Sequence, residues 1–261
     1  MTRPDIALTE PVGPAGRPLL VLGHSLGTGP LIWENAVPLL AHDFRVTLLT
    51  LPGHGIAPVP GAPFTMAELG DAVAEGVRAL LASGERALYA GVSIGGALAL
   101  QLALGHGALF AAVASLASGA ELGSREHWEA RAATVREQST STLIAASSRV
   151  WFAPVSIERE PVLTGRILHA LQDTSDEGYA RCAEALAGYD LRARLGEIAV
   201  PVLAAWGEYD TVAPEEKQDE IVAGAQRARK VCIAGVAHQP PAERAEATAD
   251  ALLEFFLGAL R

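Results

Sequence analysis

The sequence Gly-Val-Ser-Ile-Gly at positions 91–95 constrains the fold of this chain more than any other feature. An apolar run precedes it, and a run of small and apolar residues with helical character follows. This is typical of a nucleophile elbow, where a strand turns into a helix too sharply for side chains beside the serine. Gly91 and Gly95 lack the Cβ atoms that would clash there, and Gly96 lets the helix pack closely. We therefore expect Ser93 at the C-terminal end of a strand, with its hydroxyl exposed beside the free N–H groups of a helix N-terminus.

Composition and charge narrow the class of protein further. The chain has 261 residues, half of them hydrophobic, which suits one large domain or one domain with an insertion. Its formal net charge of −10 disfavours nucleic acids and anionic membranes as partners. No apolar run has the length of a membrane span, and no signal-peptide core follows the first residues. Cys182 and Cys232 are far apart in the sequence, so we expect neither a disulfide framework nor a zinc site, and we expect a cytoplasmic protein.

Short apolar runs alternate with helical patterns along the chain. We predict strands at 19–22, 45–51, 88–92, 111–116, 200–206 and 230–234. Thr65 and Glu68 form a capping box for a helix that we expect Gly84 to end, and Pro214 starts a helix before the last strand. Continuous apolar strands separated by helices indicate an α/β fold, with a mostly parallel central sheet and helices on both faces.

The segment 121–189 breaks this alternation. It is helical, poor in strands and rich in arginine, and it contains Trp128 and Trp151. Because it lies between two predicted strands, we expect an inserted helical cap over the C-terminal edge of the sheet, with residues 1–120 and 190–261 forming the core. Such a cap could set substrate choice and exclude water. The alternative is that its charges are ordinary solvated helix faces.

His238 is the best candidate for the base that a serine nucleophile needs. It follows the last predicted strand, so its loop opens at the same sheet edge as Ser93. The other histidines occupy helices or turns. We expect His24 and His54 to bond neighbouring backbone, and the rest to be surface residues, namely His42, His106, His127 and His169.

Asp210 is our candidate for the acid that orients the histidine. It follows the strand predicted at 200–206, and Glu208, nearer to that strand, is the local rival. Another possible position, after the strand at 111–116, offers only small residues in the turn. The order serine, aspartate, histidine along the chain is the one expected for a Ser-Asp-His triad on such a sheet.

The oxyanion of an acyl-transfer reaction needs two backbone donors. Ile94 N–H supplies one, because it belongs to the residue after the nucleophile. We place the second at Leu26, in the loop His24-Ser25-Leu26-Gly27-Thr28 that follows the first strong strand. Such a site needs no metal and no cofactor.

These motifs together resemble the α/β-hydrolase superfamily, and more closely the 3-oxoadipate enol-lactonases of aromatic-compound breakdown. The matching segments cover most of the chain: 24–28 with Trp33, 53–55, 64–71, 91–96, 128–131, 151–154, 177–180 and 190–192. The elbow and the triad are superfamily signals, whereas Ser-Leu-Gly-Thr and the cap segments are more specific. The chain departs from the family pattern at 51–57, at Ile94 in place of methionine, at Val150 in place of arginine and at 239–241.

The resemblance implies hydrolysis of an enol-lactone through an acyl-enzyme on Ser93. The substrate would be a small anionic lactone or ester, with Arg131 as the implied anchor for its carboxylate and Trp128 and Trp151 as further binding residues. Arg149 or another arginine of the cap is the alternative anchor. Other functions stay open: a carboxylesterase, a C–C bond hydrolase or a cofactor-free perhydrolase on the same scaffold, or a binding module without activity.

Overall fold

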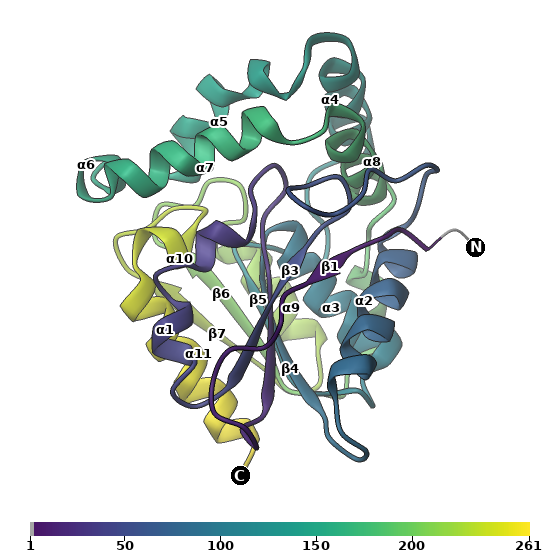
Figure 1. The fold of residues 1–261 in the computed structure, drawn as a ribbon, viewed down its shortest axis with the longest axis vertical. Coiled ribbons are helices and arrows are strands. Elements are labelled where there is room, and N and C mark those ends of the chain that lie inside the picture. Colours follow the sequence, from purple (N-terminus) through teal and green to yellow (C-terminus); the bar gives the residue numbers. More distant parts are fainter. Residues whose placement is uncertain (1–2) are drawn as a thin grey trace.

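The computed structural model describes residues 3–261 (Figure 1). Within this range a seven-stranded sheet has the strand order β1-β3-β2-β4-β5-β6-β7. Neighbouring strands are parallel except for β1 and β3, so the predicted α/β class is confirmed. The strands are β1 (Ala7–Leu8), β2 (Leu19–Gly23), β3 (Arg45–Thr50), β4 (Ala87–Val92), β5 (Phe110–Leu116), β6 (Val202–Gly207) and β7 (Ala228–Ile233).

The position of each strand in the sheet explains how well the sequence predicts it. Strands β2, β4 and β6 are buried over their whole length, as continuous apolar runs require in a sheet covered on both faces. The edge strand β7 exposes part of its length and begins at Ala228, before the apolar run that predicted it. The opposite edge strand β1 was not predicted, because two residues are too few to show a periodicity.

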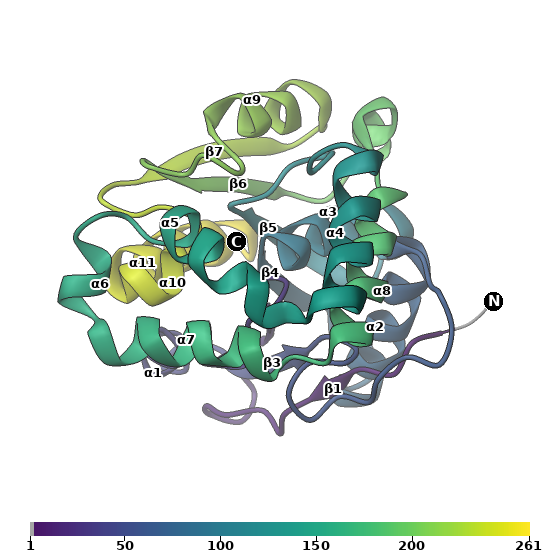
Figure 2. The same ribbon diagram turned by 90° about the horizontal axis from the view of Figure 1, so that it is seen from above.

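Helices cover both faces of the sheet (Figure 2). One face carries α2 and α3, which pack against each other, and the other carries α1 and α11. The core helices are η1 (Pro30–Trp33), α1 (Val37–Leu40), α2 (Met66–Leu80), α3 (Ile94–His106), η3 (Arg192–Glu197), α9 (Glu215–Gly224), α10 (Pro240–Glu243) and α11 (Ala245–Ala259). No helix in the described part of the chain is long and apolar enough to cross a bilayer.

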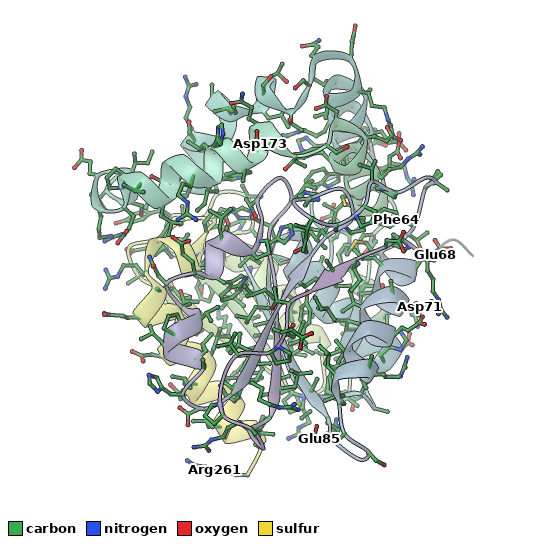
Figure 3. The ribbon with its side chains drawn as sticks, viewed as in Figure 1. Phe64, Glu68, Asp71, Glu85, Asp173 and Arg261 are labelled. Carbon is green, nitrogen blue, oxygen red and sulfur yellow. The ribbon has the colours of Figure 1, made fainter. Side chains whose placement is uncertain are left out.

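Helix α2 begins as predicted and ends earlier than predicted. The Thr65 hydroxyl accepts from Glu68 N, and the Glu68 carboxylate accepts from Thr65 N at 2.9 Å, which completes the capping box. The helix ends at Leu80 and is capped by Leu81 in an extended conformation, so the expected cap at Gly84 is wrong. Gly84 has a φ of +82° and serves the turn that leads into β4. Figure 3 shows Glu68 and Asp71 at the outer edge of the molecule, along α2.

Between β5 and β6 the chain leaves the sheet and forms a group of helices above one end of it (Figure 1). Asp173 of this group and Glu85, after α2, lie at opposite ends of the molecule (Figure 3). Glu121 and Asp190 form an isolated β-bridge where the segment leaves and rejoins the core. The helices are α4 (Arg125–Gln138), η2 (Thr140–Leu143), α5 (Ile144–Trp151), α6 (Ser156–Arg159), α7 (Pro161–Asp173) and α8 (Asp176–Ala187).

On this arrangement we propose the division into a cap, 121–189, and a core, 1–120 with 190–261. Residues 1 and 2 of the core lie outside the described range.

Candidate active site

Ser93 occupies the sharp turn between β4 and α3. Its φ of 57° and ψ of −117° are strained for a residue with a side chain, as a nucleophile elbow requires. A Cβ on Gly91 would lie 2.2 Å from the carbonyl oxygen of Gly95, so only glycine fits there. Ser93 N donates to the carbonyl of Leu116 at 2.9 Å, which ties the turn to β5. The serine is thereby held at the C-terminal end of β4, where it lines a cavity.

His238 and Asp210 form a buried pair. The Nδ1 atom of His238 lies 2.9 Å from Oδ2 and 3.1 Å from Oδ1 of Asp210. Asp210 Oδ1 also accepts from the backbone N–H groups of Val212 and Ala213. Burial raises the pKa of the Asp210 carboxyl, but His238 and these N–H groups lower it more, so the net pKa is below its usual value. An ionised Asp210 holds the proton on Nδ1 and leaves Nε2 of His238 free to act as a base.

Glu208, the rival carboxylate, lies elsewhere. Its side chain is exposed, and its Oε2 atom accepts a hydrogen bond from Gly235 N at 2.9 Å. It therefore supports the turn after β7, and the structure pairs His238 with Asp210 instead.

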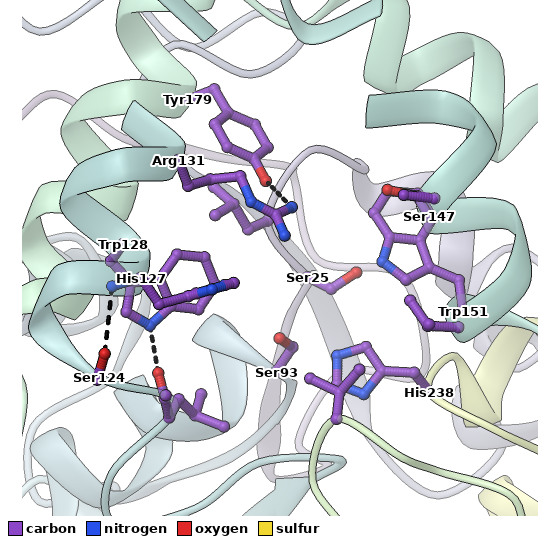
Figure 4. Close-up of a pocket in the computed structure, with 16 residues that line it drawn as sticks. Ser25, Ser93, Ser124, His127, Trp128, Arg131, Ser147, Trp151, Tyr179 and His238 are labelled. Carbon is purple, nitrogen blue, oxygen red and sulfur yellow. Dashed lines mark hydrogen bonds between the residues drawn. The ribbon is translucent and has the colours of Figure 1, made fainter. Parts of the chain in front are cut away.

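Ser93 and His238 line the same cavity, which has a volume of about 490 Å³ and lies between the core and the cap (Figure 4). Of the sixteen residues that line it, none is an aspartate or a glutamate, and Arg131 is the one arginine. The lining residues are Ser25, Leu26, Ser93, Leu122, Gly123, Ser124, His127, Trp128, Arg131, Ala146, Ser147, Val150, Trp151, Tyr179, Val212 and His238.

The two predicted oxyanion donors have free N–H groups. Within residues 3–261, no backbone or side-chain oxygen accepts a hydrogen bond from Leu26 N or Ile94 N. Leu26 lines the cavity beside Ser93. A free backbone N–H inside a protein is rare, and a pair of them beside a serine suits a carbonyl oxygen that develops negative charge.

Two buried histidines hold the loop that contains Leu26. Nε2 of His54 accepts from Gly27 N, and Nε2 of His24 accepts from Leu51 N, both at 3.0 Å. Burial lowers the pKa of His24 to about 3, with a contribution from His54, and lowers that of His54 to about 4. Both rings are therefore neutral, as an accepting Nε2 requires. The Nδ1 atoms bond neighbouring backbone, Ser25 O at 2.8 Å for His24 and Pro52 O at 2.9 Å for His54, so the prediction that these histidines bond neighbouring backbone is confirmed.

Arg131 of α4 is directed into the cavity without an acidic partner. Its Nη1 atom donates to the Tyr179 hydroxyl at 3.5 Å (Figure 4), and no carboxylate of the described residues lies within ion-pair distance. Four other cap arginines form ion pairs, namely Arg125, Arg136, Arg166 and Arg181. An unpaired guanidinium in a cavity without acids is suited to a carboxylate ligand.

Arg149, the alternative anchor, is not brought to this cavity. It is exposed and lines a separate cavity with Phe152, Pro154 and Tyr209 on the other side of α5. It therefore lies apart from Ser93.

Both predicted tryptophans line the cavity, and they differ in how they are held. Trp128 donates its indole N–H to the carbonyl of Leu122, whereas the carbonyl of Trp151 accepts from His238 N at 3.1 Å. Trp151 thus joins the cap directly to the loop of the candidate base.

His127, Ser147 and Tyr179 are among the lining residues that were not predicted as part of the site. His127 is exposed, as expected, but it also lines the cavity, and burial and Arg131 lower its pKa. Ser147 carried no signal, because a serine in a polar helix is common. Tyr179 falls in a segment that carried the family resemblance, which is the signal that could have identified it. Of the histidines expected at the surface, His106 is half-buried and bonds Asp71 at 2.8 Å.

Comparisons with known proteins identify the family of the chain. The chain matches the alpha/beta hydrolase family over residues 19–251. It is 33% identical over 213 residues to 3-oxoadipate enol-lactonase 2 of Acinetobacter baylyi, covering 81% of this chain and 79% of that protein. It is 28% identical over 260 residues to a pimeloyl-acyl-carrier-protein methyl ester esterase of Edwardsiella ictaluri, covering 92% and 94%.

A solved structure extends the likeness to the whole fold. The enol-lactonase from Burkholderia xenovorans LB400 superposes with a TM-score of 0.91 at 31% identity, covering 97% of this chain and 96% of that one. The expected resemblance to enol-lactonases is confirmed, and hydrolase activity is supported. With the match spanning nearly the entire sheet and cap, this chain belongs to the α/β-hydrolase family.

Proposed function

We propose that this protein is a serine hydrolase that opens a small anionic lactone, with 3-oxoadipate enol-lactone as its substrate. The observation that carries the proposal is the single cavity that contains Ser93, the paired His238 and the unpaired Arg131. The enol-lactonase relatives support the choice of lactone. That substrate would place the protein in the breakdown of aromatic compounds. The free cysteines Cys182 and Cys232 are consistent with a cytoplasmic location, which we also propose.

The reaction begins with acyl transfer to the serine. Ser93 Oγ attacks the lactone carbonyl while Nε2 of His238 takes its proton, and the N–H groups of Leu26 and Ile94 stabilise the oxyanion. Collapse of the tetrahedral intermediate breaks the ring C–O bond. The enol oxygen leaves with a proton from His238 and becomes a ketone. The ring opens without releasing a fragment, because the leaving group stays attached to the acyl chain.

Deacylation uses the same groups, with water as the nucleophile. His238 takes a proton from water as the water oxygen attacks the Ser93 ester, and collapse of this second intermediate breaks the bond to Ser93 Oγ, which regains its proton from His238. Asp210 stabilises the imidazolium at both stages. The product is an open keto acid with two carboxylates.

Arg131 is the proposed anchor for the carboxylate that the lactone carries. The formal net charge of −10 gives an anion no general attraction, so binding must depend on a local cation. The guanidinium donates one weak bond to Tyr179, so most of its N–H groups remain available to the ligand. Trp128 and Trp151 supply flat apolar walls on either side.

The second candidate function is a carboxylesterase. The methyl ester esterase of Edwardsiella ictaluri, which matches over 92% of this chain, favours it. The same residues would perform that reaction, so substrate preference alone distinguishes the two functions.

The experiment compares turnover on the enol-lactone with turnover on methyl and aryl esters of similar size. We expect kcat/KM for the lactone to be higher by roughly a hundredfold, because Arg131 and the enol leaving group favour it. Preference for a neutral methyl ester would favour the carboxylesterase. Turnover that requires peroxide would identify a perhydrolase, and cleavage of a C–C bond in a ring-cleavage product would identify a C–C bond hydrolase.

Labelling with a serine-reactive phosphonate tests the nucleophile itself. The native protein should be labelled at one site and Ser93→Ala should not. Absence of labelling in the native protein would support a binding module without activity.

A further inference from the structure

Glu243, at the end of α10, is a buried carboxylate that the proposed reaction does not use. Its exposed fraction is 2%, and it lies five residues after His238. A charge is rarely buried so fully unless its oxygens are well bonded. We propose that Glu243 is a positioning residue that holds the His238 loop and the cap in one fixed geometry. The proposal rests on the proposed serine-hydrolase function.

One oxygen of Glu243 holds the loop of the base from both sides. Oε1 accepts from Ala237 N at 2.9 Å and from Gln239 N at 3.1 Å, the two residues that flank His238. The backbone is therefore held one residue before and one residue after His238. Since Asp210 bonds the ring through Nδ1, the backbone and the ring together define where Nε2 lies.

The other oxygen of Glu243 holds the cap. Oε2 accepts from Ala153 N at 2.6 Å and from the Ser156 hydroxyl at 2.7 Å, which lie just after Trp151 and at the start of α6. The remaining N–H of the base loop, that of His238, donates to the carbonyl of Trp151. One carboxylate thus joins the candidate base to the cap segment whose tryptophan lines the substrate cavity.

The connection continues to the oxyanion loop. The side chain of Gln239 accepts a hydrogen bond from the Ser25 hydroxyl at 2.9 Å, and Ser25 precedes Leu26. A displacement of Glu243 would therefore move the base, one wall of the cavity and an oxyanion donor together. Reacting groups need placement to within a fraction of an ångström, so the effect falls on turnover more than on binding.

Glutamine cannot replace this carboxylate, although it has the same shape. Each oxygen of Glu243 faces at least one backbone N–H, so an amide in either orientation turns its NH₂ group towards a donor. Burial raises the pKa of Glu243, and its four hydrogen-bond donors oppose this rise by favouring the ionised form.

The test measures kcat and KM of Glu243→Gln on a neutral aryl ester, well below the unfolding temperature, with active sites counted by phosphonate labelling. We expect kcat per folded molecule to fall by about 10- to 100-fold. Glu246→Gln, an exposed acid in the next helix, is the matched control and should keep native kcat. Ser156→Ala keeps the bonds of Oε1 to the base loop, so we expect it to raise KM by about fivefold with a smaller effect on kcat.

Two results would overturn the proposal, and a third concerns the proposed function. Native kcat per folded molecule in Glu243→Gln, with only a lower unfolding temperature, would reduce Glu243 to a structural role. A loss equal to that of Glu246→Gln would do the same. Turnover that persists in Ser93→Ala would instead contradict the serine mechanism, so the two failures are distinguishable.

Discussion

The core and the cap differ in the interactions that stabilise each of them internally. Helix α3, which follows Ser93, is buried along most of its length, whereas α4 of the cap buries only Ala132 and Val135. Helix α8 buries most of one face, and a network of partly exposed ion pairs, formed by Arg136 and Arg181 with Glu177 and Glu184, adds to its packing against α4. Apolar packing is rigid and little affected by salt, while partly exposed ion pairs are weak and screened.

The candidate reacting groups and the candidate substrate-binding groups lie on different sides of this division. The candidate nucleophile and oxyanion donors belong to the tightly packed core, where the close packing of β4 and α3 holds Ser93 in a strained backbone conformation. Arg131 and the tryptophans belong to the cap, which contributes no strand to the sheet. Mutations in the core site should therefore abolish turnover, whereas mutations in the cap should change which substrate is used.

The largest effect is expected for the core nucleophile. Ser93→Ala should lower kcat by about 10⁶-fold, and His238→Ala by a similar factor, because the members of a triad act as a unit. For the same reason the double variant should be little slower than either single one. Unfolding temperatures should remain close to native. Near-native turnover in Ser93→Ala would show that another group performs the chemistry.

Removing the charge of the orienting acid should have the next largest effect. Asp210→Asn should lower kcat by about 10⁴-fold, because an amide stabilises the wrong tautomer of His238 and cannot balance its charge. Glu208→Gln is the control, since Glu208 bonds only the turn at Gly235. If steady-state kinetics showed the greater loss in Glu208→Gln, the pairing seen in the structure would not be the functional one.

A cap variant should affect one class of substrate and spare another. Arg131→Met should lower kcat/KM on the carboxylate lactone by roughly 10- to 100-fold, since a hydrogen bond to a charged group contributes about 1.5–3 kcal/mol. A neutral ester of similar size should react at the native rate. Equal losses on both substrates would give Arg131 a structural role, and no loss on either would argue against an anionic substrate.

The core should lose stability at a higher pH than the cap does. In the folded protein the pKa is about 3 for His24 and about 4 for His54, below the ordinary value of 6.5. Between the folded pKa and pH 6.5, each histidine therefore binds more protons in the unfolded state than in the folded state. The free energy of unfolding should then fall below about pH 6.5, with a slope of at most about 1.4 kcal/mol per pH unit for each histidine. Urea unfolding at several pH values measures this slope, and His54→Gln should reduce it by about half. An unchanged slope in that variant would contradict the assignment.

The ion pairs between α4 and α8 should contribute least to the free energy of unfolding. The hydrogen bond from Arg136 is the main cause that lowers the pKa of Glu184 below 4.5, so its stabilisation is present above that pH and is lost as the pH falls further. Because the Glu184 side chain is about a third exposed, Glu184→Gln should cost at most about 1 kcal/mol. Urea unfolding at low and high salt measures the cost, which should shrink at high salt. Glu158→Gln, an exposed acid of α6, is the control, and an equal cost there would remove the case for a network effect.

The features that could be predicted from the sequence are those that a few neighbouring residues decide. The glycines around Ser93 impose the elbow through local sterics, the capping box starts α2 through contacts three residues apart, and apolar runs mark the buried strands. The edge strand β1 and the end of α2 were missed or misplaced, because a two-residue strand has no period and Gly84 serves a turn rather than a cap.

Only the tertiary structure decided which side chains meet. The sequence left Asp210 and Glu208 as rivals, and the path of the loops after β6 and β7 brings the first to His238 and the second to Gly235. Likewise, the arginines of the cap look alike in the sequence, yet Arg131 enters the cavity of Ser93 and Arg149, a residue of α5, lines a separate cavity. Partner choice depends on contacts between residues far apart in the chain, which propensity and periodicity do not encode. Glu243 shows this most clearly, because its four bonds join segments up to 90 residues apart in the sequence.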